Sequence, residues 1–145
     1  MTRQELSGDT VFDTSVFIEL LAGTRIGSMV RELLKSNSIN ASTTELNIAE
    51  LRYILCRRVG RTKSSETVGK LMRSGYIRIF PVTELIEHAS RIKCQRAISL
   101  ADCFTLALAE RLNVNVAFAR HERELDEELG KKPFKVKTLF LEDSS

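Results

Sequence analysis

The stretch Thr10-Val11-Phe12-Asp13-Thr14-Ser15 (residues 10–15) decides the predicted fold. It reads as a short buried strand that ends at an acid and passes almost directly into a helix predicted over 15–22, which Gly23 ends. Strands this short and apolar throughout are typical of parallel sheets, which helices cover on both faces.

The rest of the chain repeats this unit of strand and helix. Strands are predicted at 10–12, 38–41, 76–82, 114–118 and 136–141, and helices at 15–22, 26–34, 42–59, 64–74, 83–97, 99–112 and 122–129. We expect the helix over 42–59 to begin with a capping box in Ser42-Thr43-Thr44-Glu45, and the helix over 99–112 to begin with a similar pattern at Ser99. The alternation predicts an α/β protein with a parallel sheet, and 145 residues fit a single domain over 1–145.

Composition excludes several classes of protein. The three cysteines, Cys56, Cys94 and Cys103, are widely spaced and form no CxxC motif, so reduced core cysteines are expected rather than a zinc site or disulfides. The polar first ten residues do not resemble a signal peptide, and no apolar run approaches the ~18 residues of a membrane span. We therefore expect a soluble, cytoplasmic protein with no membrane partner.

Basic residues gather in one segment of the chain. Residues 52–78 hold eight Lys and Arg against a single acid, a formal charge of +7, so the rest of the chain sums to −4 of the overall +3. Such a localised basic surface indicates either a polyanionic partner or merely a solvated helical face.

Two acids are predicted near the ends of strands. In parallel α/β sheets, ligands bind beyond the carboxyl ends of the strands. Asp13 follows the first strand, where it could act in a site or cap the next helix, although Thr14 and Ser15 could also cap it. Glu122 follows the strand over 114–118 and begins an acidic cluster, most of which is expected to be a solvated helical turn.

Two further acids lie on predicted helices. Glu50 falls in the stripe of Leu46, Tyr53 and Ile54, where a carboxylate is costly unless it binds a metal, reaches solvent or pairs with a base such as Arg57. Asp102 is in the first turn of an apolar helix, where the helix dipole alone would account for an acid. Glu45 is assigned to its capping box and left out of the site.

The ordered acids Asp13, Glu50, Asp102 and Glu122 are more specific together than singly. With the motifs VFDTS (11–15), NIAEL (47–51) and SLADCFTLALA (99–109), they resemble the PIN-domain family over roughly residues 10–141. Within that family the chain is most similar to VapC-type ribonuclease toxins, especially archaeal ones. The resemblance implies a three-layer α/β/α sandwich around a central, mostly parallel sheet of four to five strands.

The resemblance also implies a function. It assigns Asp13, Glu50 and Asp102 to the family's first three acids and a Mg²⁺ or Mn²⁺ site, and Thr14 or Ser15 to a metal-bound water or the substrate. The fourth position departs from the family pattern, because Glu122 replaces the usual Asp, with Asp126 as the fallback, and Arg120 replaces the usual Thr. The expected activity is metal-dependent cleavage of RNA, with Arg57 and Arg58 of the basic segment positioning the RNA backbone.

Partners and alternatives follow from the same resemblance. Related toxins form homodimers and are silenced by a small antitoxin protein, for which residues 26–35 and 43–58 are the candidate contacts. A PIN module that binds RNA or protein without cleavage is the first alternative. An aspartate-nucleophile phosphatase is the second, disfavoured because Ser15 stands where such enzymes have a second Asp. The two histidines, His88 and His121, are too isolated for a catalytic pair. His88 is expected on a helix surface, and His121 at most beside Glu122.

Overall fold

A computed structural model describes residues 5–144, which contain a five-stranded sheet in the order β3-β2-β1-β4-β5. Every neighbouring pair of strands is parallel. The strands are β1 (Gly8–Phe12), β2 (Ile39–Thr44), β3 (Ile77–Phe80), β4 (Asn115–Phe118) and β5 (Thr138–Phe140). The predicted parallel α/β sheet is therefore confirmed.

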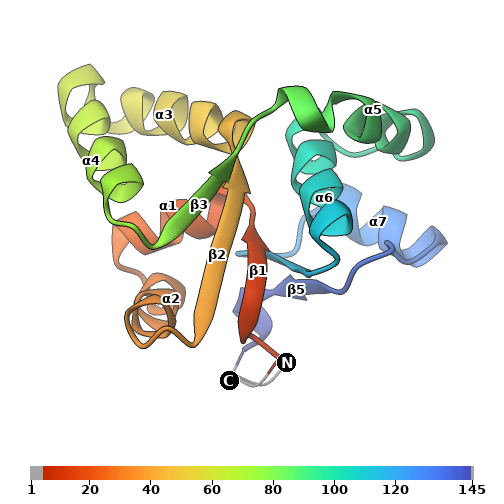
Figure 1. The fold of residues 1–145 in the computed structure, drawn as a ribbon, viewed down its shortest axis with the longest axis horizontal. Coiled ribbons are helices and arrows are strands. Elements are labelled where there is room, and N and C mark those ends of the chain that lie inside the picture. Colours follow the sequence, from red (N-terminus) through yellow and green to blue (C-terminus); the bar gives the residue numbers. More distant parts are fainter. Residues whose placement is uncertain (1–4, 145) are drawn as a thin grey trace.

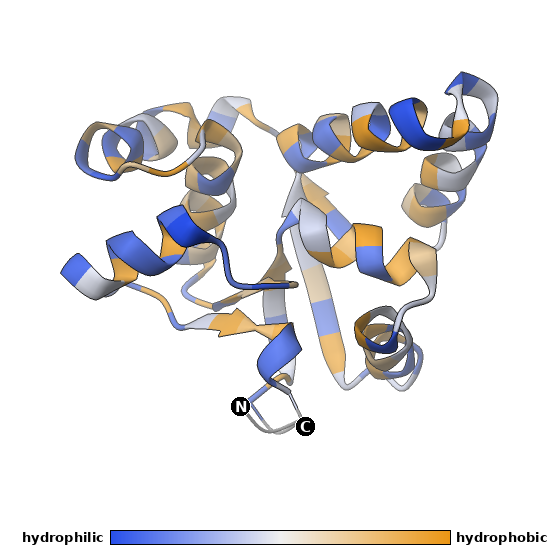
Figure 2. Ribbon diagram, turned by 180° about the vertical axis from the view of Figure 1, so that it is seen from behind, coloured by the Kyte–Doolittle hydropathy of each residue, from blue (hydrophilic) through white to orange (hydrophobic). Residues whose placement is uncertain are grey.

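Seven α-helices and two 3-10 turns connect the strands within the described residues (Figure 1). They are α1 (Thr14–Ala22), α2 (Arg25–Lys35), α3 (Glu45–Val59), α4 (Arg61–Arg73), η1 (Thr83–Leu85), α5 (Ile86–Gln95), α6 (Leu100–Leu112), α7 (Arg123–Lys131) and η2 (Leu141–Asp143). Hydrophilic and hydrophobic residues alternate along the helices, as expected for helices with one buried face (Figure 2).

Two hydrophobic cores cover the two faces of the sheet. Neighbouring strand residues alternate between them, since Phe12 and Ala117 belong to one core and Val11 and Val116 to the other. Side chains of α1 to α4 complete the first core, and those of α5 to α7 with η1 complete the second. The protein is thus the predicted three-layer α/β/α sandwich.

The order of the strands determines where the site can lie. The chain runs from β1 to β2 and β3 on one side, and the later strands β4 and β5 add on the other side. The order reverses between β1 and β4, and the crevice beyond the carboxyl ends of such strands is the usual binding place in α/β sheets. The two ends of the described chain lie together at the opposite edge (Figure 1).

The predicted starts of two helices were wrong. Ser42 and Thr43 belong to β2, so no capping box forms there. Thr44 caps α3 instead, by accepting a hydrogen bond from the Asn47 amide. The Glu45 side chain accepts a hydrogen bond from the Val82 amide at 3.0 Å. Helix α4 begins at Arg61 rather than at Ser64, because Gly60 at φ 89° allows the chain to turn directly from α3 into α4.

The cysteine prediction was right for only one residue. Cys103 is buried in the second core, whereas Cys56 and Cys94 are exposed, and all three are free thiols. Among residues 5–144, none of the helices combines the length and hydrophobicity that a membrane crossing requires.

Candidate active site

Asp13 occupies the junction between β1 and α1. It is the N-cap of α1 and accepts a hydrogen bond from the Ser15 amide at 3.0 Å, so its capping role is real. Capping alone does not explain its surroundings, because the residue is only 4% exposed. This burial raises the pKa of Asp13, and the charge of Glu50 raises it further. The hydrogen bonds from Ser15 act in the opposite direction.

Asp102 lies in the first turn of α6. Ser99 caps this helix as predicted, accepting a hydrogen bond from the Asp102 amide at 3.1 Å. The Asp102 side chain is buried, and this burial raises its pKa to about 8, with further contributions from the charges of Asp13, Glu122 and Glu50. A carboxyl group in this environment holds its proton unless a cation replaces it.

Glu122 and Glu50 complete the group. Glu122 is the N-cap of α7, yet its side chain makes no capping hydrogen bond. The residue is exposed, but its carboxyl group is partly desolvated, and this desolvation, followed by the charges of Asp13, Glu124 and Glu50, raises its pKa. Glu50 is half-buried on α3 and acts electrostatically on all three other acids. The structure therefore brings the four predicted acids, from four different elements, into one mutually repelling group.

The apolar stripe from which Glu50 was predicted is not the buried face of α3. The buried residues of α3 are Asn47, Ile48 and Leu51, whereas Tyr53 is 48% exposed and Glu50 lies at the edge of the packed face. Arg57, the proposed partner of Glu50, instead lies over the Tyr53 ring at 5.2 Å.

No cation of the described chain balances this group. Within residues 5–144, Asp13, Glu50, Asp102 and Glu122 form no ion pair within 4.0 Å. Arg120 turns away from them and binds Glu19 of α1 at 2.7 Å. Uncompensated carboxylates are the donor set that hard divalent cations such as Mg²⁺ prefer, so the residues present fit such an ion.

A tighter set of possible ligands lies next to this group. Among the described residues, only His121, Glu142 and Asp143 place ligand atoms within 4.8 Å of one another. Both ring nitrogens of His121 are already bound, to Asp126 at 2.9 Å and to Asp143 at 2.7 Å, and these hydrogen bonds raise its pKa. The His121 ring also stacks on Phe140, so these residues link α7 to β5 and η2. Asp126, the fallback for the fourth acid, is engaged by His121.

A buried hydrogen-bond network connects the helices that carry the acids. The Asn47 side chain, which is fully buried, donates to the hydroxyls of Thr14 at 3.1 Å and Thr105 at 2.9 Å, and accepts from Thr44 at 2.6 Å. Asn47 and Thr105 each lie three residues from an acid of the same helix, Glu50 and Asp102 respectively. The network therefore fixes α1, α3 and α6 relative to one another at the site.

Sequence reasoning missed this network, although a signal for it existed. Residues three apart on a helix share a face. An amide or hydroxyl one turn from each helical acid could thus have been expected to point toward the same region.

Asn47→Leu is expected to lower the free energy of unfolding by about 2–4 kcal/mol, because three buried hydrogen bonds are lost. Chemical denaturation measures this change. Asn40→Leu is the matched control, because Asn40 is exposed and, within the described residues, its side chain bonds only to Asp9. We expect an effect within about 0.5 kcal/mol. Equal effects of the two substitutions would contradict a special role of the network.

The other predicted site residues lie in two places. The Thr14 hydroxyl belongs to the network, and the Ser15 hydroxyl accepts a hydrogen bond from the Ala119 amide at 3.0 Å, so both are engaged by the protein itself. Arg57 and Arg58 are exposed in the last turn of α3, seven and eight residues beyond Glu50. At 1.5 Å per residue this places them roughly 10–12 Å along the helix from the acids.

The fold and this acidic edge define a class: an α/β/α protein whose carboxylates converge beyond a parallel sheet. The family model of the PIN domain matches residues 10–127, and the chain belongs to this family. No curated protein is similar enough to match the chain.

Solved structures share the fold. VapC20 of Mycobacterium tuberculosis, described as a toxin that cleaves the sarcin–ricin loop, is 20% identical with a TM-score of 0.64, covering 81% of this chain and 93% of its own. A chain of the DNA-bound VapBC complex of Salmonella typhimurium is 14% identical with a TM-score of 0.69, covering 92% and 98%. FitAcB of Neisseria gonorrhoeae is 20% identical with a TM-score of 0.59, covering 92% and 99%.

Proposed function

We propose that this protein is a metal-dependent endoribonuclease and the toxin of a toxin–antitoxin pair, with residues 1–145 acting as one nuclease domain. The observation that carries the proposal is the group of four carboxylates at the reversal point of the sheet, which have no cationic partner among residues 5–144. The PIN family supports a nuclease. The sarcin–ricin loop cleavage ascribed to VapC20 supports RNA as the substrate.

Each acid has a proposed role. Asp13, Glu50 and Asp102 hold one Mg²⁺ or Mn²⁺ ion, and Glu122 shares a second with Asp102. Bound there, such ions activate water and neutralise charge on the scissile phosphate. Asp13 and Asp102 are the rigid, buried ligands, while Glu50 and Glu122 are more exposed and can adjust their side chains to the ion.

The residues around the acids position the substrate and the ligands. Asn47 keeps the three acid-bearing helices in place through its buried hydrogen bonds. The basic surface of α3 and α4, including Arg57 and Arg58, holds the RNA backbone, so binding weakens with salt. Thr14 and Ser15 support the site next to Asp13.

The partners belong to the same proposal. We expect a small antitoxin protein to inhibit the nuclease, because several structurally similar chains come from VapBC complexes or a toxin–antitoxin complex. The family resemblance further leads us to expect a homodimer in the cytoplasm.

The test is RNA cleavage by the purified protein. Labelled RNAs of varied structure are incubated with Mg²⁺ or Mn²⁺, with and without a chelator, and the product ends are identified. We expect cleavage that requires the metal and leaves a 5′-phosphate. Cleavage that survives chelation would contradict the metal site.

A binding module without cleavage is the second candidate. The observation that favours it is the spacing of the acids, because no three of them place ligand atoms within 4.8 Å of one another in the described chain. Calorimetric Mn²⁺ binding at Asp13 and Asp102, with no cleavage of any RNA, would select this candidate.

A further inference from the structure

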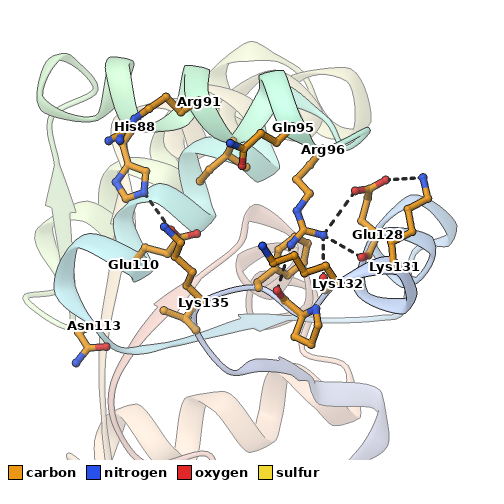
Figure 3. A pocket seen from close by; sticks show the side chains of 14 residues that line it. His88, Arg91, Gln95, Arg96, Glu110, Asn113, Glu128, Lys131, Lys132 and Lys135 are labelled. Atoms are coloured by element: carbon orange, nitrogen blue, oxygen red, sulfur yellow. Dashed lines mark hydrogen bonds and ion pairs between the residues drawn. The ribbon is translucent and has the colours of Figure 1, made fainter.

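A second candidate site lies away from the acids, between α5, α6, α7 and the loop that precedes β5 (Figure 3). This cavity has a volume of about 760 Å³. Its lining contains five Lys or Arg residues and two Glu, a formal charge of +3 with His88 neutral. The C-terminal ends of α5, α6 and α7 contribute about half a negative charge each, which leaves the cavity positive.

The two acids of the cavity are already paired. Glu110 pairs with His88 at 3.1 Å, and Glu128 pairs with Lys131 at 3.0 Å and Arg96 at 3.6 Å. The hydrogen bond from Lys131 lowers the pKa of Glu128, which keeps this carboxylate ionised. Both acids are therefore engaged by side chains of the cavity itself.

Arg96 forms the wall of the cavity rather than its binding surface. It donates to the carbonyls of Glu128, Lys132 and Pro133 at 2.8–3.1 Å and stacks on Phe134 at 4.7 Å (Figure 3). These bonds fix the loop before β5 against the end of α7. The cavity is therefore preformed.

Three cations in the lining remain free. The side chains of Arg91, Lys132 and Lys135 are exposed and make no hydrogen bond or ion pair with residues 5–144. A preformed cavity whose unpaired groups are donors fits an anion, and phosphate is the anion that Arg and Lys bind most commonly in nucleic acids.

The two helices that carry site acids also reach this cavity. Asp102 begins α6, and Glu110 lies eight residues further, roughly 12 Å along the axis. Glu122 precedes α7, and Glu128 lies six residues further. An RNA strand bound at the acids has to run along these helices to reach the cavity, which a longer RNA does and a short one does not.

We propose that this cavity binds the phosphate groups of an RNA strand that extends beyond the cleavage site. The proposal rests on the ribonuclease function proposed above. It assigns Arg91, Lys132 and Lys135 to the RNA backbone, in addition to the basic surface of α3 and α4.

The test compares two matched double variants in an Asp13→Asn background, so that RNA is bound without being cut. The cavity variant is Arg91→Gln with Lys135→Gln. The control is Arg31→Gln with Lys35→Gln, an exposed Arg and Lys of α2 that also lack a partner in the described chain and change the net charge equally. Affinity is measured against salt for single-stranded RNAs of about 4 and about 16 nucleotides.

For the longer RNA, we expect the cavity variant to bind more weakly than the control and to reduce the slope of log affinity against log salt by about 1.4. For the shorter RNA, the two variants should not differ. Identical slopes on the longer RNA would overturn the proposal. A second outcome would also overturn it: the slopes stay equal, but inorganic pyrophosphate raises the melting temperature only of proteins that keep Arg91 and Lys135. The cavity would then bind a small phosphorylated ligand rather than RNA.

Failure of this proposal is distinguishable from failure of the proposed function. The binding comparison requires no catalysis. If the wild-type protein cleaves no RNA but the slopes differ as expected, the nuclease function fails and the cavity assignment stands.

Discussion

Asp13→Asn is expected to reduce RNA cleavage by more than 100-fold while the protein stays folded. Substituting residues that merely support a metal ligand costs about 10–100-fold, and Asp13 is proposed as a ligand itself. Asn has the same shape and is as good an N-cap, so the hydrogen bond from the Ser15 amide and the start of α1 should persist. Cleavage rates under metal saturation measure the effect.

The same substitution should raise stability in the absence of metal. Burial raises the pKa of Asp13, so ionising this carboxyl in the folded protein is unfavourable, and a neutral amide removes that penalty. We expect a higher melting temperature for Asp13→Asn than for wild type in a chelator, and a lower one at high Mg²⁺, where only wild type gains from the ion.

Asp9→Asn is the matched control for both measurements. Asp9 lies on the same strand but is exposed, and its side chain contacts Asn40. Neither cleavage nor melting temperature should change. If Asp13→Asn cleaves RNA as fast as Asp9→Asn, Asp13 is not a ligand of the catalytic ion.

Asp102 should make the metal-free protein less stable as pH rises. An unperturbed aspartate titrates at 3.8, and Asp102 in the folded protein titrates at about 8. Folding therefore favours the protonated form, whose stabilising contribution is complete below pH 3.8 and is lost as pH rises to about 8. The full difference is on the order of 5 kcal/mol, and unfolding curves in a chelator across this range measure it.

Asp102→Asn isolates this effect. Asp13, His121 and Glu122 also have raised pKa values and lose stabilising protons in the same direction, so wild type alone would not assign the pH dependence. The variant should be more stable than wild type at pH 8 and similar near pH 4. Parallel stability curves for the two proteins would contradict the high pKa of Asp102.

Magnesium should reverse the trend. Because a cation competes with the proton on Asp102, the increase in melting temperature caused by Mg²⁺ should grow from about pH 6 to pH 8 in wild type. The Asp102→Asn variant should show little of this increase. Differential scanning fluorimetry at matched ionic strength measures both.

The helices and strands were largely predictable because their signals are local. Gly23 ends α1, Ser99 caps α6, and the short apolar strands required a sheet covered on both faces. The errors arose where two local patterns competed. Ser42 looked like the N-cap of a capping box, but strand pairing with β1 and β3 extended β2 to Thr44 and displaced the cap by two residues.

The four acids were identified from their order and motifs, and the sequence by itself determined that Asp13 and Glu122 follow strands and that Glu50 and Asp102 lie on helices. Only the tertiary structure decided that they act on one another, because this depends on α1, α3, α6 and α7 meeting at one edge of the sheet. It also decided that Asn47 links three of these elements and that the cavity at Arg91, Lys132 and Lys135 exists. These features depend on side chains far apart in the chain, and residue patterns carry only local information about burial and hydrogen bonding.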